Sequence, residues 1–123
     1  MIESKRLRIL IVDDDASLLE MLERAFQKAG AEVVAHSTFE EARRALHDDG
    51  FDALLTDVRL GAFNGLQLAV ISRDAHPEIR VIVFSGFDDP VLRAEAEAVG
   101  ATYVVKPVTT DILLELVRRP RTS

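Results

Sequence analysis

Short apolar runs alternate along this chain with longer segments in which apolar residues recur every three or four positions. Five runs rich in Val, Ile, Leu and Phe predict β-strands, at residues 7–12, 33–36, 53–56, 81–84 and 102–105. The runs are continuous rather than interrupted by alternating polar residues, which is typical of a parallel sheet covered on both faces. The sequence therefore predicts a buried parallel sheet.

The segments between the strands predict five helices. The clearest covers residues 16–29, which Asp15 is expected to cap and Gly30 to end. Ser37 and Glu40 fit a capping box at the start of the second helix. The second helix is predicted to end near Asp48. The third is predicted to begin at Asn64 or Gly65 and to end before Pro77, and the fourth to begin at Asp88 or Asp89 and to end at Gly100. The fifth is predicted to begin near residues 109–111 and to end before Pro120.

Strict alternation of strand and helix predicts an α/β fold of the (βα)5 type. Right-handed crossovers with helices on both faces give an open, doubly wound parallel sheet of five strands, whose common order is 2-1-3-4-5. The 123 residues contain no internal linker, so we predict a single domain over 1–123, with 118–123 as a tail or the start of a linker. Ligands of such sheets bind beyond the carboxyl ends of the strands, where strands 1 and 3 are neighbours.

Composition and charge exclude several classes of protein. The net charge is −6, from 15 Lys+Arg against 21 Asp+Glu, so the surface would repel nucleic acid and anionic membranes. The chain has no cysteine, which rules out disulfides and thiolate metal sites. No apolar run could span a membrane and the N-terminus lacks a signal peptide, so we expect a cytoplasmic protein with no direct nucleic-acid or membrane partner.

Polar and charged residues gather at the predicted carboxyl ends of the strands. Asp13 and Asp14 follow the first strand and Asp57 follows the third, so these carboxylates are expected to converge. Carboxylates at close range repel one another unless a cation joins them, and an all-oxygen set favours Mg²⁺ over zinc or copper. Ser85 and Lys106 follow the fourth and fifth strands. A hydroxyl, a lysine and a hydrated divalent ion around a carboxylate are the groups that hold a phosphoryl group during transfer.

Four motifs stand in order at these strand ends. They are the acidic end of the first strand at 9–15, Leu54-Leu55-Thr56-Asp57 with Gly65 eight residues later, Phe84-Ser85-Gly86, and Tyr103-Val104-Val105-Lys106-Pro107. Together they resemble the receiver domain of two-component response regulators, the family of the single-domain chemotaxis regulator. The resemblance covers the whole chain, implies a flavodoxin-like fold, and suggests a cis bond between Lys106 and Pro107.

The resemblance implies that Asp57 is the phosphoacceptor, which attacks a phosphoryl donor and becomes an aspartyl phosphate. Asp14 and Asp57 would contribute side-chain oxygens to Mg²⁺, Arg59 would contribute its backbone carbonyl, and Asp13 would act through a water. Lys106 would pair with a phosphoryl oxygen. Such a protein catalyses only its own phosphorylation and dephosphorylation and is not an enzyme in any wider sense.

The resemblance also implies a conformational switch. Ser85 would move to bond the phosphoryl group, and the vacated space would let Tyr103 change rotamer, so that the surface of the fourth helix, fifth strand and fifth helix rearranges. Taken alone, Tyr103 also fits a half-buried aromatic of an edge strand, and Ser85 a turn residue. We expect Arg59 and Phe87, at the rim of the pocket, to shield the aspartyl phosphate from water and lengthen its lifetime.

The implied phosphoryl donor is a phosphohistidine on a sensor histidine kinase or phosphotransfer protein, or a small acyl phosphate. A homodimer that forms on phosphorylation is a further partner to test. Two positions depart from the family pattern, because Gly61 replaces a frequent proline and Val108 a frequent aromatic residue. We expect a more mobile loop over 59–64 and thinner packing near the fifth helix.

Two other functions fit part of the sequence. Asp13-Asp14-Asp15 also satisfies the Asp-x-Asp pattern of a Mg²⁺-dependent phosphohydrolase of the haloacid-dehalogenase type, with Asp13 as the nucleophile. That interpretation gives Asp57 no role, and the chain is too short for a substrate domain. The second is a pseudo-receiver that binds partners without phosphorylation, although the acids, the hydroxyl and the lysine are all present.

Overall fold

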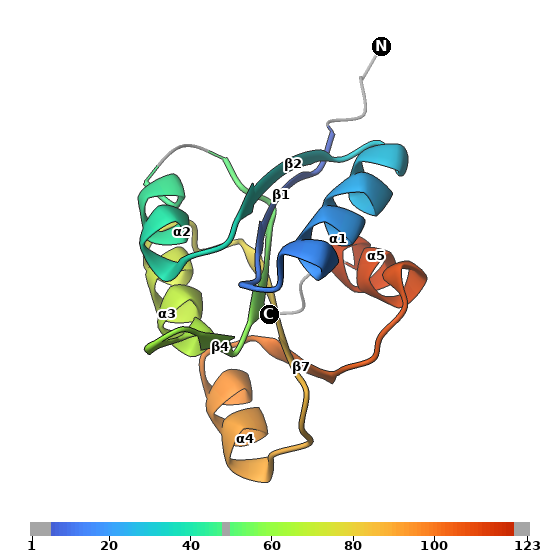
Figure 1. Ribbon diagram of the computed structural model, residues 1–123. Coiled ribbons are helices and arrows are strands. Elements are labelled where there is room, and N and C mark those ends of the chain that lie inside the picture. Colours follow the sequence, from blue (N-terminus) through green and yellow to red (C-terminus); the bar gives the residue numbers. More distant parts are fainter. Residues whose placement is uncertain (1–5, 48–49, 120–123) are drawn as a thin grey trace.

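Five strands form one parallel sheet in the order β2-β1-β3-β6-β7 (Figure 1). The computed structural model describes residues 6–47 and 50–119. The strands of the sheet are β1 (Arg8–Val12), β2 (Glu32–His36), β3 (Ala53–Asp57), β6 (Arg80–Ser85) and β7 (Thr102–Val105). Because β6 and β7 are the fourth and fifth strands of this sheet along the chain, the predicted order 2-1-3-4-5 is confirmed.

Helices cover both faces of the sheet, as predicted for a doubly wound fold. They are α1 (Ala16–Lys28), α2 (Phe39–Ala45), α3 (Gly65–Ala75), α4 (Pro90–Ala98) and α5 (Thr110–Arg118). Figure 1 shows α1 and α5 on one face and α2 and α3 on the other. Side chains of β1 alternate between the two cores, since Ile9 and Ile11 cluster with Phe26 of α1, whereas Leu10 and Val12 belong to the opposite cluster.

A short hairpin follows β3, where the sequence predicted an irregular loop. Its strands β4 (Arg59–Leu60) and β5 (Phe63–Asn64) pair in antiparallel fashion, and Gly61 occupies the left-handed region at φ +62°. Phe63 stacks on Phe39 at the start of α2, with 4.5 Å between the ring centroids. Two-residue strands are too short to produce a periodic pattern, which is why sequence analysis missed the hairpin.

The cap of α2 lies one residue later than predicted. Thr38, not Ser37, is the N-cap: its Oγ1 accepts a hydrogen bond from the Glu41 backbone N–H and donates one to the Glu41 carboxylate. Both Ser37/Glu40 and Thr38/Glu41 have the spacing of a capping box, so the spacing alone could not choose. The helix ends at Ala45, and Asp48, the predicted end, lies outside the described residues.

The other helix starts agree with the sequence. Asp15 caps α1 and Asp89 caps α4, and Asn64 caps α3 in a box with Gln67. The helix α5 ends at Arg118, before Pro120, and the predicted tail lies outside the described residues from position 120 onward. Within the described ranges no helix has the length and apolarity needed to cross a bilayer.

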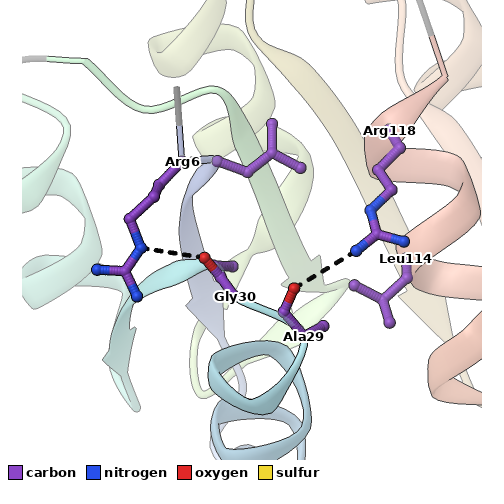
Figure 2. A pocket seen from close by; sticks show the side chains of 7 residues that line it. Arg6, Ala29, Gly30, Leu114 and Arg118 are labelled. Atoms are coloured by element: carbon purple, nitrogen blue, oxygen red, sulfur yellow. Dashed lines mark hydrogen bonds between the residues drawn. The ribbon is translucent and has the colours of Figure 1, made fainter. Parts of the chain in front are cut away.

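A cavity of about 280 Å³ lies at the amino ends of the strands, between the end of α1 and α5 (Figure 2). The Arg6 guanidinium donates to the carbonyl of Gly30 at 3.2 Å, and that of Arg118 donates to the carbonyl of Ala29 at 3.5 Å. The described lining holds neither a carboxylate nor a hydroxyl. The acid and hydroxyl chemistry predicted from the sequence therefore belongs to the other end of the sheet.

Candidate functional site

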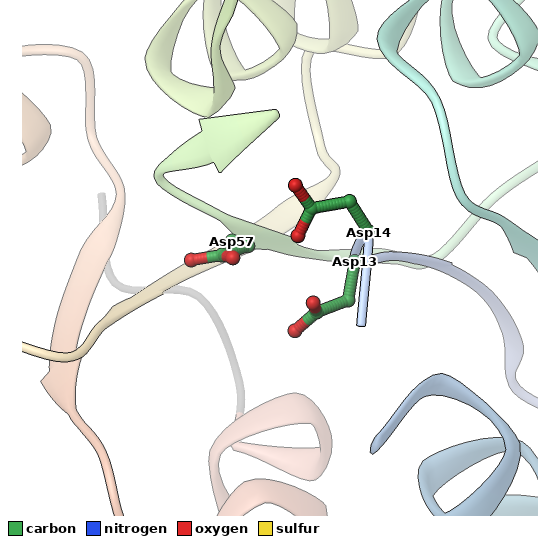
Figure 3. A group of neighbouring side chains, drawn as sticks. All are labelled: Asp13, Asp14 and Asp57. Atoms are coloured by element: carbon green, nitrogen blue, oxygen red, sulfur yellow. The ribbon is translucent and has the colours of Figure 1, made fainter. Parts of the chain in front are cut away.

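Three carboxylates converge where β1 and β3 end side by side. Asp13 and Asp14 follow β1, and Asp57 is the last residue of β3. One oxygen from each carboxylate lies within 4.8 Å of the others, and Figure 3 shows Asp13 and Asp14 extending toward the side of the site where Asp57 lies. Asp13 is fully buried and Asp57 is 9% exposed, whereas Asp14 is open to solvent. The convergence predicted from the strand order is therefore present.

Lys106 brings a positive charge from the end of β7. Its Nζ lies 3.3 Å from Asp13 Oδ2 and 3.6 Å from Asp57 Oδ2. The Lys106–Pro107 peptide bond is cis, as the resemblance suggested. Three carboxylates and one ammonium leave two negative charges uncompensated, and one divalent cation would neutralise them.

The surroundings of Asp57 disfavour the negative charge of its carboxylate. Burial raises the pKa of its carboxyl group above the ordinary value, and the nearby Asp13 and Asp14 charges raise it further. The Lys106 ammonium and a hydrogen bond from the Arg59 backbone lower the pKa without cancelling these effects. An added cation would relieve the repulsion, and the all-oxygen donor set fits Mg²⁺ or Ca²⁺.

Asp13 is held in place by two partners. Its Oδ1 accepts a hydrogen bond from the Asp15 backbone N–H at 2.8 Å, and its Oδ2 faces Lys106. A carboxylate that is fully buried and bonded on both oxygens has little freedom to approach an incoming phosphorus atom. The geometry therefore restrains Asp13 more than Asp57, which is slightly exposed and lies next to Lys106.

Ser85 and Tyr103 meet at the backbone of a third residue, Phe87. The Phe87 N–H donates to Ser85 Oγ at 3.2 Å, and the Tyr103 hydroxyl donates to the Phe87 carbonyl at 2.6 Å. Tyr103 is only 5% exposed, so it is buried more deeply than a half-buried aromatic of an edge strand. Ser85 is also buried, at the end of β6, rather than exposed in a turn.

The two predicted rim residues contact each other. Phe87 is 68% exposed, and the guanidinium carbon of Arg59 lies 5.9 Å from the centroid of its ring, within the range of a cation–π contact. Arg59 stands two residues beyond Asp57, and Phe87 two beyond Ser85. The contact between Arg59 and Phe87 therefore connects the segment that follows β3 with the segment that follows β6.

Gly65 and Thr56 both pack against the backbone carbonyl of Asp57. A Cβ at Gly65 would lie 2.0 Å from the Asp57 carbonyl oxygen, so only glycine fits at this position. The fully buried Thr56 donates from Oγ1 to the same carbonyl at 2.9 Å. The sequence placed Thr56 in a motif but gave it no role, although its hydroxyl, which follows three apolar residues of the strand, was an available signal.

Comparison with known proteins identifies the family of this chain. The family model described as the response regulator receiver domain matches residues 9–118. The chain belongs to this family. A receiver domain protein from Methanospirillum hungatei JF-1, described as CheY-like, superposes on this receiver domain with a TM-score of 0.87 and 28% identity, over 93% of this chain and 92% of that one.

Two further relatives describe the wider family. A response regulator from Burkholderia pseudomallei, solved with a phosphorylated aspartic acid, calcium ion and citrate, has a TM-score of 0.86 and 25% identity, over 91% of this chain and 66% of that one. The DNA-binding transcriptional regulator NtrC of Proteus hauseri is 32% identical over 90% of this chain. This receiver domain spans 24% of that regulator's length.

Proposed function

We propose that this receiver domain is the phosphoacceptor of a two-component phosphorelay and that Asp57 takes a phosphoryl group from a phosphohistidine. The donor is a sensor histidine kinase or a phosphotransfer protein. One observation carries the proposal: Asp57 stands at the strand ends with Asp13 and Asp14 within 4.8 Å and Lys106 at 3.6 Å. This arrangement supplies a nucleophile, a cation site and a charge for the phosphoryl oxygens.

In the transfer step, an Asp57 carboxylate oxygen forms a bond to phosphorus while the bond from phosphorus to the histidine nitrogen breaks. Lys106 Nζ, already 3.6 Å from that carboxylate, neutralises one phosphoryl oxygen. The Ser85 hydroxyl turns from Phe87 to bond another. Mg²⁺ would be held by Asp14, Asp57, the Arg59 carbonyl and, through water, Asp13, and when bound it would neutralise charge on the transferred group.

Small acyl phosphates fit the same step, with a carboxylate as the leaving group. We propose no reaction of this domain beyond its own phosphorylation and dephosphorylation. Phosphorylation then alters the surface formed by α4, β7 and α5, where Ser85 and Tyr103 connect the pocket to the outside. We infer that this surface serves a protein partner or a second copy of the chain, because a net charge of −6 disfavours direct binding to nucleic acid.

Mass spectrometry after incubation with acetyl phosphate and Mg²⁺ tests the proposal. The parent should gain one phosphoryl group, and Asp57→Asn should gain none. Asp74→Asn, an exposed aspartate of α3, is the matched control and should be labelled like the parent. Labelling that survives Asp57→Asn but is lost in Asp13→Asn would support the phosphohydrolase, and an unlabelled parent would support the pseudo-receiver.

A further inference from the structure

Tyr103 is clamped on two sides in the unphosphorylated domain. Its hydroxyl donates to the Phe87 carbonyl at 2.6 Å, and the guanidinium carbon of Arg93 lies 4.9 Å from the centroid of its ring. The side chain is 5% exposed, so the clamp holds it in the buried position. In the proposed switch this is the position that phosphorylation favours, because Ser85 then withdraws toward the pocket.

Arg93 connects three elements through one side chain. It lies in the first turns of α4, where its backbone N–H donates to the carbonyl of the N-cap Asp89. Its guanidinium reaches back to Asp88, which accepts a hydrogen bond at 2.9 Å, and it also covers the ring of Tyr103 in β7. Arg93 therefore ties α4, the segment before it and the edge strand together.

The ion pair with Asp88 contributes little by itself, since the two side chains are 39% and 69% exposed. Its effect is to restrain the guanidinium, so that its central carbon stays over the Tyr103 ring. A cation–π contact of this kind at a partly exposed site shifts an equilibrium by roughly two- to fivefold. That is enough to change the resting balance between two arrangements that differ little in energy.

We propose that Arg93 is a positioning residue of the switch, which holds Tyr103 buried before phosphorylation and thereby sets the resting population of the α4–β7–α5 surface. The proposal rests on the proposed function only in one respect: it takes the α4–β7–α5 surface as the part of the domain that phosphorylation alters. Phe87 is the point of coupling, because its N–H binds Ser85 and its carbonyl binds Tyr103. When Ser85 turns to the phosphoryl group, Phe87 keeps the Tyr103 contact alone.

The composition of the chain provides a direct assay. Tyr103 is the single tyrosine and there is no tryptophan, so tyrosine fluorescence reports this side chain alone. Quenching by acrylamide, which is uncharged, measures how often the ring reaches solvent. Arg93→Gln should raise the quenching constant of the unphosphorylated protein roughly two- to fivefold, in proportion to the added exposed population. Arg24→Gln, which breaks an exposed ion pair with Glu20 on α1, is the matched control and should leave it unchanged.

Labelling with acetyl phosphate and Mg²⁺ separates a switch from simple loosening. In Arg93→Gln, phosphorylation should return the quenching constant toward the parent value, whereas the parent itself should change little. An unchanged constant in Arg93→Gln, an equal rise in Arg24→Gln, or a rise that labelling does not reverse would each overturn the proposal. If mass spectrometry finds no phosphoryl group at all, the proposed function fails, while the first comparison still decides whether Arg93 holds Tyr103.

Discussion

Replacing Asp57 by asparagine should make the domain more stable at neutral pH while removing its acceptor. Asparagine keeps the shape and an oxygen that accepts the hydrogen bond from the Arg59 backbone, but it carries no charge. With an effective dielectric constant of about 20, the repulsions from Asp13 and Asp14, whose oxygens lie within 4.8 Å, amount to at least about 3.5 kcal/mol each, and the attraction to Lys106 at 3.6 Å to about 4.6 kcal/mol. The variant should therefore gain at least about 2 kcal/mol in unfolding free energy.

The gain should depend on pH with a defined sign. The folded state raises the pKa of Asp57, chiefly through burial, so the folded protein loses stability as pH rises through the folded pKa. Below the ordinary value of 3.8 the carboxyl is protonated in both states, and parent and variant should converge. Urea unfolding of both proteins at neutral pH and near this value measures the difference directly. Glu78→Gln, an exposed carboxylate in the turn before β6, controls for the change in net charge.

Magnesium should reduce the same difference. Millimolar Mg²⁺ should stabilise the parent more than Asp57→Asn, since the variant has lost one ligand and most of the repulsion that the ion relieves. A variant that is less stable than the parent at neutral pH without Mg²⁺ would refute the argument from repulsion. So would a gain that persists undiminished under acidic conditions, or one that Glu78→Gln reproduces.

Three other predictions, made with four variants, test separate parts of the site. Asp14→Asn should nearly abolish labelling by acetyl phosphate while Asp57 remains intact, because a cation ligand is lost; a rate in the parent that a chelator does not alter would contradict this. Phe87→Glu and Arg59→Asn should each shorten the half-life of the phosphorylated protein by admitting water, and longer half-lives in both would disprove the shielding. Gly65→Ala should cost roughly 1–3 kcal/mol in urea unfolding, since its Cβ would meet the Asp57 carbonyl at 2.0 Å; an unchanged midpoint would show that the turn adapts.

Most of the sheet could be predicted because its signal is local. Continuous apolar runs marked all five strands, and the usual order of a doubly wound sheet then placed Asp13, Asp14 and Asp57 together. The hairpin of β4 and β5 was not predicted because its two-residue strands are too short to show an alternating pattern of apolar and polar residues. Its position depends instead on Phe63 stacking against Phe39, a contact between segments that no spacing rule connects.

The finer contacts of the site escaped for a different reason. The sequence alone predicts that Tyr103 is a half-buried aromatic residue of an edge strand. Its deeper burial is explained by its partners in space, Phe87 and Arg93. The placement of a long side chain such as that of Arg93 depends on rotamers and neighbours rather than on periodicity. Ser37 and Thr38 have the same spacing to Glu40 and Glu41, so the spacing could not show that Thr38 is the cap.

The ion pair between Lys106 and Asp13 joins residues 93 positions apart. The residues of the proposed site come from four different strand ends: Asp13 and Asp14, Asp57, Ser85, and Lys106, which follows the last strand of the sheet along the chain. A nascent chain that still lacks β7 therefore has no complete pocket and should be inert toward phosphoryl donors. The pocket is complete only once the chain through Lys106 has been made and folded, so competence for phosphorylation should come late in the folding of this domain.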